Sequence, residues 1–354
     1  MGKEKLSKTV KILFLDSSVD DEVILMKHVE FHRALIKTEM IELFKDESIL
    51  NYKLNITLID SRGEPEPGVG VGVEREALSL FFREFYTSFT VGREEKVPSI
   101  RHDMSRNDWR AIARIIIYGV KVEYFPISLS PIFLISTLFG DDALNETELI
   151  DSFKNYISLE EKDTITAMLK DFKEGDEDLL DVLSAYNCKS KPKADNLKAL
   201  IQELAHQELV QKPRYVSNCF SEVFVSAKKH HPFRSKEELS NFYESRKPNS
   251  KKVIQSLVCN PTTDDERTVF NHLTRLIKTL GKEELVLFIR FVTGGDLLPL
   301  QINIEYTDQV PRVPRATTCV NRLTLSTDYS CYNQLAEEFL SVLREKESFS
   351  FSYH

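Results

Sequence analysis

The chain has 354 residues and a mass of 40.9 kDa, with a formal net charge of −8 and a pI of about 5.6. This length is enough for more than one hydrophobic core, so we expect at least two structural units. The negative charge argues against a dedicated nucleic-acid-binding protein, whose binding face would be basic. The five cysteines have neither the paired spacing of a zinc site nor that of a disulfide framework. We therefore expect a protein of a reducing compartment, without a metal or a cofactor.

The sequence predicts neither a targeting segment nor a membrane-spanning segment. The first eight residues lack the apolar core of a signal peptide, which favours the cytoplasm, the nucleus or both. The run from 124 to 140 is uncharged, but it is shorter than the roughly 20 residues of a membrane span and contains Pro126 and Pro131. We expect this run to form a buried helix-turn-helix crossing, and we expect no membrane partner.

The first 150 residues combine a strand with amphipathic helices. Leu54, Ile56 and Leu58 alternate with polar neighbours, which predicts a half-buried strand. The glycines that follow at 68–72 lack the Lys-Ser/Thr of a phosphate-binding loop and indicate a turn. Ser105 with Asp108 predicts the start of a helix. Two helical faces are expected, one with Leu78, Phe81, Phe82 and Phe85 and one with Trp109, Ile112, Ala113 and Ile116.

Residues 141–185 are strongly acidic, with 14 Asp and Glu against 4 Lys and no Arg. Basic patches follow at 189–193 and 228–231. A run of like charge is usually a solvated helix face. Charge alone therefore leaves open whether this segment meets a basic partner.

The segment from 247 to 265 loses periodicity and is rich in Pro, Asn, Ser and Thr, which predicts a linker or hinge. Residues 265–354 then show periodicities of their own, which predict a compact mixed unit. Its expected elements are a helix with Val269, Phe270, Leu273, Leu276, Ile277 and Leu280, a helix with Leu285, Phe288, Ile289 and Val292, a strand with Leu300, Ile302, Ile304 and Tyr306, and a helix with Leu335, Phe339, Val342 and Leu343.

Cys319 lies in that unit between Arg315 and Arg322. A thiol reacts as its thiolate, and nearby guanidinium charge favours the thiolate. The setting therefore favours a nucleophile and suggests acyl or thioester exchange. A small, inert packing cysteine is the alternative that composition alone leaves open.

The segment 315–323 resembles the active-site segment of HECT-type E3 ubiquitin ligases. The likeness continues at 72–84, 109–124, 288–294 and 310–315, in the family's order and spacing from about residue 54 to the end, with a looser match from about 160 to 262. The resemblance implies an α+β, bilobal HECT-like fold. A mainly helical N-terminal lobe (1–258) would contain a small E2-binding subdomain at about 160–230, and a hinge (259–264) would connect it to a smaller mixed α/β C-terminal catalytic lobe (265–354).

The resemblance also implies the activity and the partners. Cys319 would accept ubiquitin from an E2 enzyme as a thioester and transfer it to a lysine of a protein substrate. Thr318 and Asn321 would donate hydrogen bonds to the developing oxyanion, with Arg315 as a further supporting residue. Phe351 occupies the place of a phenylalanine that the family uses near its C-terminus, and Phe349 is the alternative that local context favours. The acidic segment would then steer the basic N-terminal helix of an E2.

Two departures from the family pattern leave alternatives open. Val320 replaces an aromatic residue, and Thr324 replaces an aspartate that would suit proton removal from the substrate lysine. Asp308 and Asp328 are candidate substitutes for this carboxylate. One alternative is a catalytically weak HECT-like module that binds E2 or ubiquitin. The other is an unrelated cysteine hydrolase, although neither histidine of the C-terminal segment lies in a recognisable motif.

Overall fold

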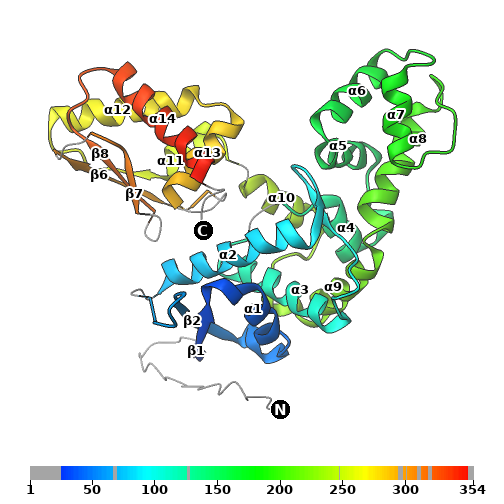
Figure 1. The fold of residues 1–354 in the computed structure, drawn as a ribbon, viewed down its shortest axis with the longest axis horizontal. Coiled ribbons are helices and arrows are strands. Elements are labelled where there is room, and N and C mark those ends of the chain that lie inside the picture. Colours follow the sequence, from blue (N-terminus) through cyan, green and yellow to red (C-terminus); the bar gives the residue numbers. More distant parts are fainter. Residues whose placement is uncertain are drawn as a thin grey trace.

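The computed structural model describes residues 25–66, 70–125, 128–246, 248–293, 298–299, 301–308, 312–317 and 321–349. Helices make up most of these residues, and the strands form three small sheets (Figure 1). This mixture confirms the expected α+β class. Across the same residues, no helix combines the length and apolar character needed to cross a membrane.

The predicted strand is confirmed as β2 (Tyr52–Ile59), whose Leu54, Ile56 and Leu58 are buried. It pairs in parallel with β1 (Leu25–His32). The chain passes from β1 to β2 through α1 (Ile36–Phe44).

The two predicted helices are confirmed as α2 (Val71–Ser88) and α3 (Arg106–Lys121). Ser105 and Asp108 form the expected capping box at the start of α3. Buried side chains from both helices enter one hydrophobic cluster: Leu78, Phe81, Phe82, Phe85, Trp109, Ile112, Ala113 and Ile116. Inside it the Tyr118 hydroxyl donates to the Glu74 carboxylate and accepts from the Leu54 amide at 2.9 Å. Burial raises the pKa of Glu74.

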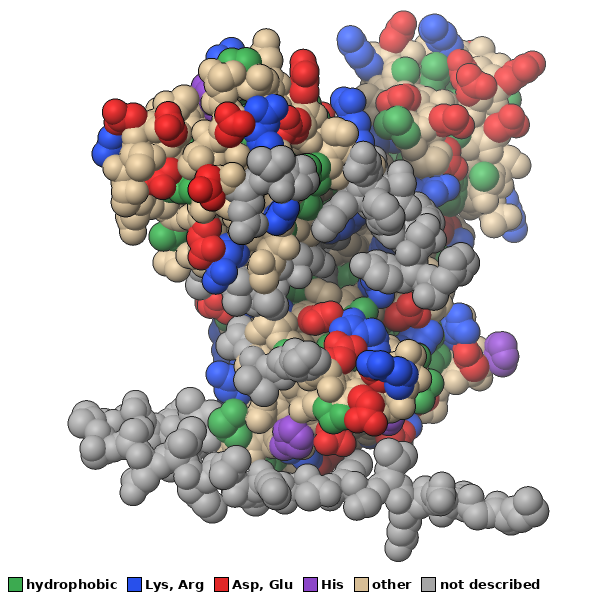
Figure 2. Space-filling model, turned by 60° about the vertical axis from the view of Figure 1, so that its left-hand side comes forward, with side chains coloured by type: hydrophobic (Ala, Val, Ile, Leu, Met, Phe, Trp, Pro, Cys, Tyr) green, Lys and Arg blue, Asp and Glu red, His purple; other side chains and the backbone are tan. Residues whose placement is uncertain are grey.

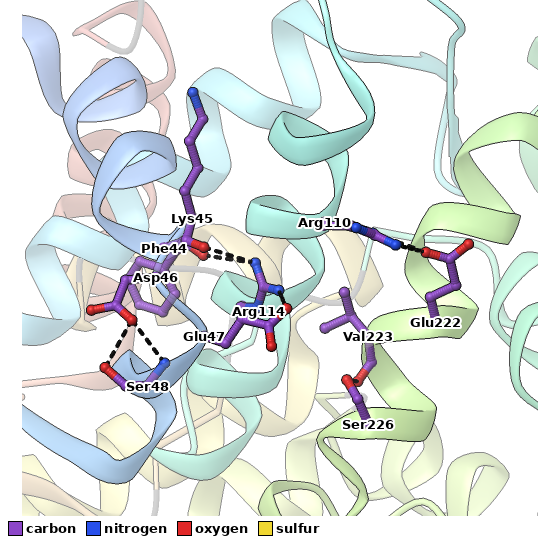
Figure 3. A network of polar contacts seen from close by, with 10 residues as sticks. All are labelled: Phe44, Lys45, Asp46, Glu47, Ser48, Arg110, Arg114, Glu222, Val223 and Ser226. Carbon is purple, nitrogen blue, oxygen red and sulfur yellow. Dashed lines mark hydrogen bonds and ion pairs between the residues drawn. The ribbon is translucent and has the colours of Figure 1, made fainter.

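Arginines on α3 connect α1 and α9 (Arg214–Ser226) through the network drawn in Figure 3. The buried Arg114 guanidinium donates to the Phe44 carbonyl at 3.1 Å, at the C-terminal end of α1, and pairs with Glu47. One turn earlier, Arg110 pairs with Glu222 of α9. A carbonyl at a helix end has no partner within the helix, so a guanidinium is a favourable donor there.

The described residues of the uncharged run 124–140 contain one helix, α4 (Pro131–Phe139), so the expected helix-turn-helix is wrong. Pro131 occupies the first turn, where its missing N–H costs nothing, so it begins this helix instead of breaking one. The backbone before it is held by Lys96, whose N–H donates to the Ser128 carbonyl at 2.7 Å and whose carbonyl accepts from the Ser130 N–H at 2.8 Å. Pro126 lies outside the described residues. Lys96 belongs to a short antiparallel pair, β3 (Thr90–Gly92) with β4 (Lys96–Pro98).

The acidic segment folds as part of an arm that projects from the rest of the molecule in Figure 1. The arm contains α5 (Glu146–Tyr156), α6 (Leu159–Lys170), α7 (Glu177–Ala185) and α8 (Leu197–His206), and a π-helical turn (Gln207–Gln211) leads from α8 toward α9. Figure 2 shows Asp and Glu side chains exposed on this arm, at upper right. Six of the 14 acidic residues lie in the first turns of α5, α6 and α7, where the helix dipole favours negative charge.

Nearly all buried hydrophobic side chains of the described residues belong to two clusters that share no member. The first extends from Val29 to Tyr243 in α10 (Lys236–Arg246), and the second from Val253 to Leu343. The predicted linker is wrong at 250–258, which forms α11 (Ser250–Ser256) and β5 (Leu257–Val258). Val253 is fully buried in the second cluster, so its apolar contacts order this stretch. The predicted end of the N-terminal lobe at 258 and the predicted end of the hinge at 264 stay predictions.

The expected elements of the C-terminal unit are confirmed where they are described. They are α12 (Asp264–Thr279), α13 (Lys282–Thr293), β6 (Ile302–Thr307) and α14 (Tyr332–Phe349). Leu300 lies outside the described residues. The apolar residues predicted for α12, α13 and α14 are buried in the second cluster or packed against it.

Candidate functional site

Two strands lie on either side of the predicted nucleophile. β7 (Arg315–Thr317) pairs antiparallel with β8 (Arg322–Ser326), and Thr317 is the register partner of Arg322. Cys319, Thr318 and Phe351 lie outside the described residues. The structure therefore describes the two strands that precede and follow the predicted cysteine in the sequence.

Asn321 ends the connection between these strands. It has a positive φ of 48°, a left-handed conformation that asparagine adopts more readily than most residues. Its carbonyl accepts a hydrogen bond from the Asn303 N–H at 2.9 Å, and the residue is buried. Asn321 thus links the turn to β6, while its predicted role as an oxyanion donor stays a prediction.

The four-stranded sheet has the order β5-β6-β8-β7 and one covered face. Ile302, Ile304, Leu323 and Leu325 alternate onto the covered face and pack into the second cluster. Alternate residues of a strand point to opposite faces. The opposite face, which we call the open face, is polar and carries Asn303, Glu305, Arg315, Thr317, Arg322 and Thr324.

The open face brings together the two arginines that the sequence singled out. Arg322 Nε lies 3.1 Å from Glu305 Oε1, and both side chains are about half exposed. The register also aligns Thr324 with Glu305 on one side and with Arg315 on the other. Among the described side chains, no acidic group lies within ion-pair distance of Arg315. The cationic character of this face therefore depends more on Arg315 than on Arg322.

Glu305 is a site residue that our reading of the sequence missed. It lies on another strand, upstream of the cysteine loop, and only the β6–β8 register places it next to Thr324. A signal was present, because the alternation predicted for Ile302, Ile304 and Tyr306 puts residue 305 on the other face. Glu305 is therefore a carboxylate beside the position where the family pattern has aspartate.

The two acidic residues named from the sequence lie at the other end of the β6–β8 ladder. Asp308 follows Thr307, which pairs with Ser326, and Asp328 lies two residues beyond Ser326. Four residues of strand separate Ser326 from Arg322, roughly 13 Å at 3.3 Å per residue. Glu305 is the described carboxylate closest in register to the cysteine loop.

A polar cavity of about 370 Å³ opens beside the open face. Its lining includes Asn260, Thr262, Glu266, Glu305, Tyr306 and Arg322. The Tyr306 hydroxyl lies 3.0 Å from the Cys259 sulfur, and burial raises the pKa of Tyr306. Because the cavity shares Glu305 and Arg322 with the open face, a group bound there would contact the same ion pair.

The four cysteines that lie within the described residues, Cys188, Cys219, Cys259 and Cys331, are free thiols. Cys219 is buried, and burial raises its thiol pKa, which disfavours the thiolate. Cys331 is exposed and directly precedes α14. Within the described part of the chain, no group of three or more His, Cys, Asp and Glu side chains is arranged to hold a metal ion.

Comparison with known proteins assigns the chain to a family. A family model described as HECT-domain (ubiquitin-transferase) matches residues 117–352, which is more than half of the chain and includes the whole β7–β8 hairpin. No curated protein matches the chain. We conclude that the chain belongs to the HECT-domain (ubiquitin-transferase) family.

Proposed function

We propose that this protein is an E3 ubiquitin-protein ligase that accepts ubiquitin on Cys319 and transfers it to a substrate lysine. The observation that carries the proposal is the family match across 117–352, within which Cys319 connects two strands whose arginines share an exposed face. The partners are a ubiquitin-charged E2, ubiquitin and a protein substrate. The test is loading of ubiquitin from E2 onto the chain, detected on a non-reducing gel.

In the first step the Cys319 thiolate attacks the carbonyl carbon of the E2 thioester. A new carbon–sulfur bond forms, the bond to the E2 sulfur breaks, and the E2 leaves as a thiolate. Because one thioester replaces another, the exchange is nearly thermoneutral and depends on thiolate supply and on alignment of the two sulfurs. Arg315 favours the thiolate through its positive charge, and Arg322 contributes less because Glu305 partly neutralises it.

In the second step a substrate lysine attacks the Cys319 thioester. A carbon–nitrogen bond forms, the carbon–sulfur bond breaks, and a proton leaves the amine. A carboxylate near the thioester assists by accepting that proton or by orienting the amine. Glu305 is our candidate for this role, because it lies on the open face beside Thr324.

Replacing Glu305 with glutamine should lower the rate of ubiquitin discharge from Cys319 to lysine by about 100-fold, the lower end of general-base effects. Loading from E2 should change less than about threefold, since that step needs no base and glutamine keeps a hydrogen-bond acceptor for Arg322. Pulse-chase discharge to free lysine measures the first rate, and single-turnover loading the second. Asp308→Asn is the matched control and should discharge normally. An unchanged discharge rate in Glu305→Gln rules out this role.

We further propose that the arm receives the E2. Two of its leucines are exposed, Leu159 at 71% and Leu180 at 42%, and both have acidic neighbours in the sequence. Exposed apolar side chains with a charged rim are typical of transient protein interfaces. The predicted subdomain at about 160–230 includes Leu180 and most of the acidic segment.

Reversing charges in Glu174→Lys/Asp181→Lys should slow loading from E2 severalfold at low salt and weaken its salt dependence, because surface charge mainly affects the association rate. The Asp176 side chain accepts from the Leu179 N–H and caps α7, so it is left intact. Loading rates at 20 to 500 mM salt measure the effect. Glu30→Lys/Glu64→Lys, with the same charge change outside the arm, is the control. Equal rates for the two double variants would argue against electrostatic steering by the arm.

The two other functions receive less support. In the hydrolase alternative His272 would be a general base, but its ring packs against Tyr332 at the start of α14, 6.2 Å between ring centroids, and it is not part of the lining of the cavity that Arg322 borders. The His354 side chain lies outside the described residues. A catalytically weak module would bind E2 without forming an adduct, and the presence of Glu305 beside Thr324 favours an active enzyme instead.

A further inference from the structure

The chain enters and leaves the β7–β8 hairpin at neighbouring points. Arg312 precedes β7 by three residues, and Asp328 and Tyr329 follow β8. The Arg312 Nη1 donates to the Asp328 carbonyl at 2.7 Å, and the Tyr329 hydroxyl donates toward the Arg312 carbonyl at 3.1 Å. Side-chain contacts therefore connect the two ends of the segment that carries Cys319.

The same two side chains bind Glu338 of α14. Arg312 donates from Nε at 3.0 Å and from Nη2 at 2.7 Å to Glu338 Oε1, and the Tyr329 hydroxyl lies 3.1 Å from Oε2. The Arg312 guanidinium also lies over the Tyr329 ring, 5.1 Å from its centroid. Tyr329 is buried, and the next residue of α14, Phe339, is fully buried in the second cluster. Glu338 is thus a fixed anchor, and the three residues form one unit that we call the hairpin clamp.

The hairpin needs an anchor of this kind. β7 is three residues long and lies at the edge of the sheet, with β8 as its only strand partner among the described residues. A short strand held by one ladder has little stability of its own. Contacts at its base, together with the packing of α13 against β7 and β8, therefore decide how closely the hairpin keeps one orientation relative to the helices behind it.

We propose that the hairpin clamp, formed by Arg312, Tyr329 and Glu338, holds the β7–β8 hairpin in the orientation that presents Cys319 to the incoming thioester. The inference rests on the proposed function. Arg312, Tyr329 and Glu338 are positioning residues, since they contact the base of the hairpin and act on the thiol through β7 and β8. Sulfur-to-sulfur exchange requires the reacting atoms to approach to about 3–3.5 Å in alignment, and a displacement of about 1 Å can cost 100-fold in rate.

The contacts of Arg312 depend on the shape of its guanidinium group. Its planar guanidinium binds Glu338 and Asp328 in different directions while it stacks on the Tyr329 ring. The ammonium group of lysine has neither the forked set of N–H donors nor the planar surface that stacks on an aromatic ring. Arg312→Lys therefore tests geometry while it preserves charge, and Tyr329→Phe removes one hydroxyl while it preserves the ring.

The first experiment measures single-turnover loading of ubiquitin onto Cys319 over a range of E2-ubiquitin concentrations. Arg312→Ala and Arg312→Lys should lower the maximal loading rate by about 10- to 100-fold, and Tyr329→Phe by about 10-fold. The half-saturating E2 concentration should stay within twofold, because the clamp lies outside the arm. Alkylation of Cys319 by iodoacetamide should also stay within twofold, since a small reagent needs no alignment. Arg275→Ala is the matched control, because Arg275 stacks on Tyr332 at 4.0 Å in the same unit but away from the hairpin, and it should load normally.

The second experiment needs no ubiquitin and measures amide hydrogen exchange in residues 315–326 of the same variants. The clamp predicts faster exchange there in Arg312→Ala and Tyr329→Phe than in the wild type or Arg275→Ala, with the α12 amides unchanged. Equal exchange in all four proteins overturns the clamp, whether or not the protein loads ubiquitin. Faster exchange with a normal maximal loading rate overturns its positioning role. If the variants exchange faster but the wild-type protein accepts no ubiquitin, the result supports the clamp and overturns the proposed ligase function.

Discussion

Replacing Cys319 with alanine is expected to lower ubiquitin transfer to lysine by at least about 1,000-fold. Covalent catalysis divides a difficult step into two easier ones, and removing the nucleophile leaves only binding and orientation. The E2 should still bind the arm, because the substitution leaves that surface unchanged. Multiple-turnover ubiquitination of a lysine acceptor, with E2-only transfer subtracted, measures the loss.

The control for this prediction is Cys331→Ala. Cys331 is an exposed thiol in the same unit, so a general effect of removing an accessible cysteine would appear in both variants. Normal transfer in Cys331→Ala and loss in Cys319→Ala would assign the nucleophile. Full transfer in Cys319→Ala would mean that another thiol, or no thiol, carries ubiquitin.

Replacing Trp109 with alanine is expected to lower the free energy of unfolding by about 3–5 kcal/mol, the usual cost of truncating a large buried aromatic residue. Trp109 is fully buried, and its ring lies 6.1 Å from Phe89 and 6.4 Å from Phe220. The side chain therefore joins α3 to the end of α2 and to α9. Guanidinium denaturation followed by far-UV circular dichroism measures the change, since the chain has a single tryptophan and fluorescence would be lost with it.

Trp109→Phe separates ring packing from the indole N–H. Within the described residues, the indole nitrogen has no hydrogen-bond partner, so removing it leaves no protein group unpaired. We expect Trp109→Phe to cost less than half as much as Trp109→Ala. A loss below about 1 kcal/mol in Trp109→Ala would contradict the packing described for α3.

The helices and the first strand were predictable because their apolar residues repeat at the spacing of the element. Leu54, Ile56 and Leu58 follow a period of two, and the face containing Trp109 follows the helical period. Ser105 and Asp108 marked the start of α3 because a capping box is a local signal. Local signals of this kind can be recognised in the sequence without knowledge of the tertiary structure.

Features that depend on distant contacts were not predictable. α11 was taken as linker because the segment around it loses apolar periodicity and is rich in Pro, Asn, Ser and Thr, yet Val253 is ordered by burial in the second cluster. Pro131 was read as a helix breaker, and its position at a helix start depends on backbone pairing with Lys96. Both errors come from judging a segment by composition when its tertiary partners decide its structure.

The candidate site likewise contains residues that the sequence could predict and residues that it could not. Cys319 and Arg315 were found from a local motif, and Asn321 was placed by its neighbours in that motif. Glu305 and the hairpin clamp required the strand register and the packing of α14, which join residues far apart in the sequence. A sequence can therefore name a nucleophile more readily than the groups that position and assist it.

The most direct test of the account is to incubate the wild-type protein with E1, ATP, E2 and ubiquitin and to run the products on a non-reducing gel. We expect an adduct one ubiquitin larger that disappears with thiol reductant, and peptide mapping should place the ubiquitin C-terminus on Cys319. If no E2 in a broad panel produces such an adduct, or if the adduct maps to another residue, the proposed mechanism is contradicted.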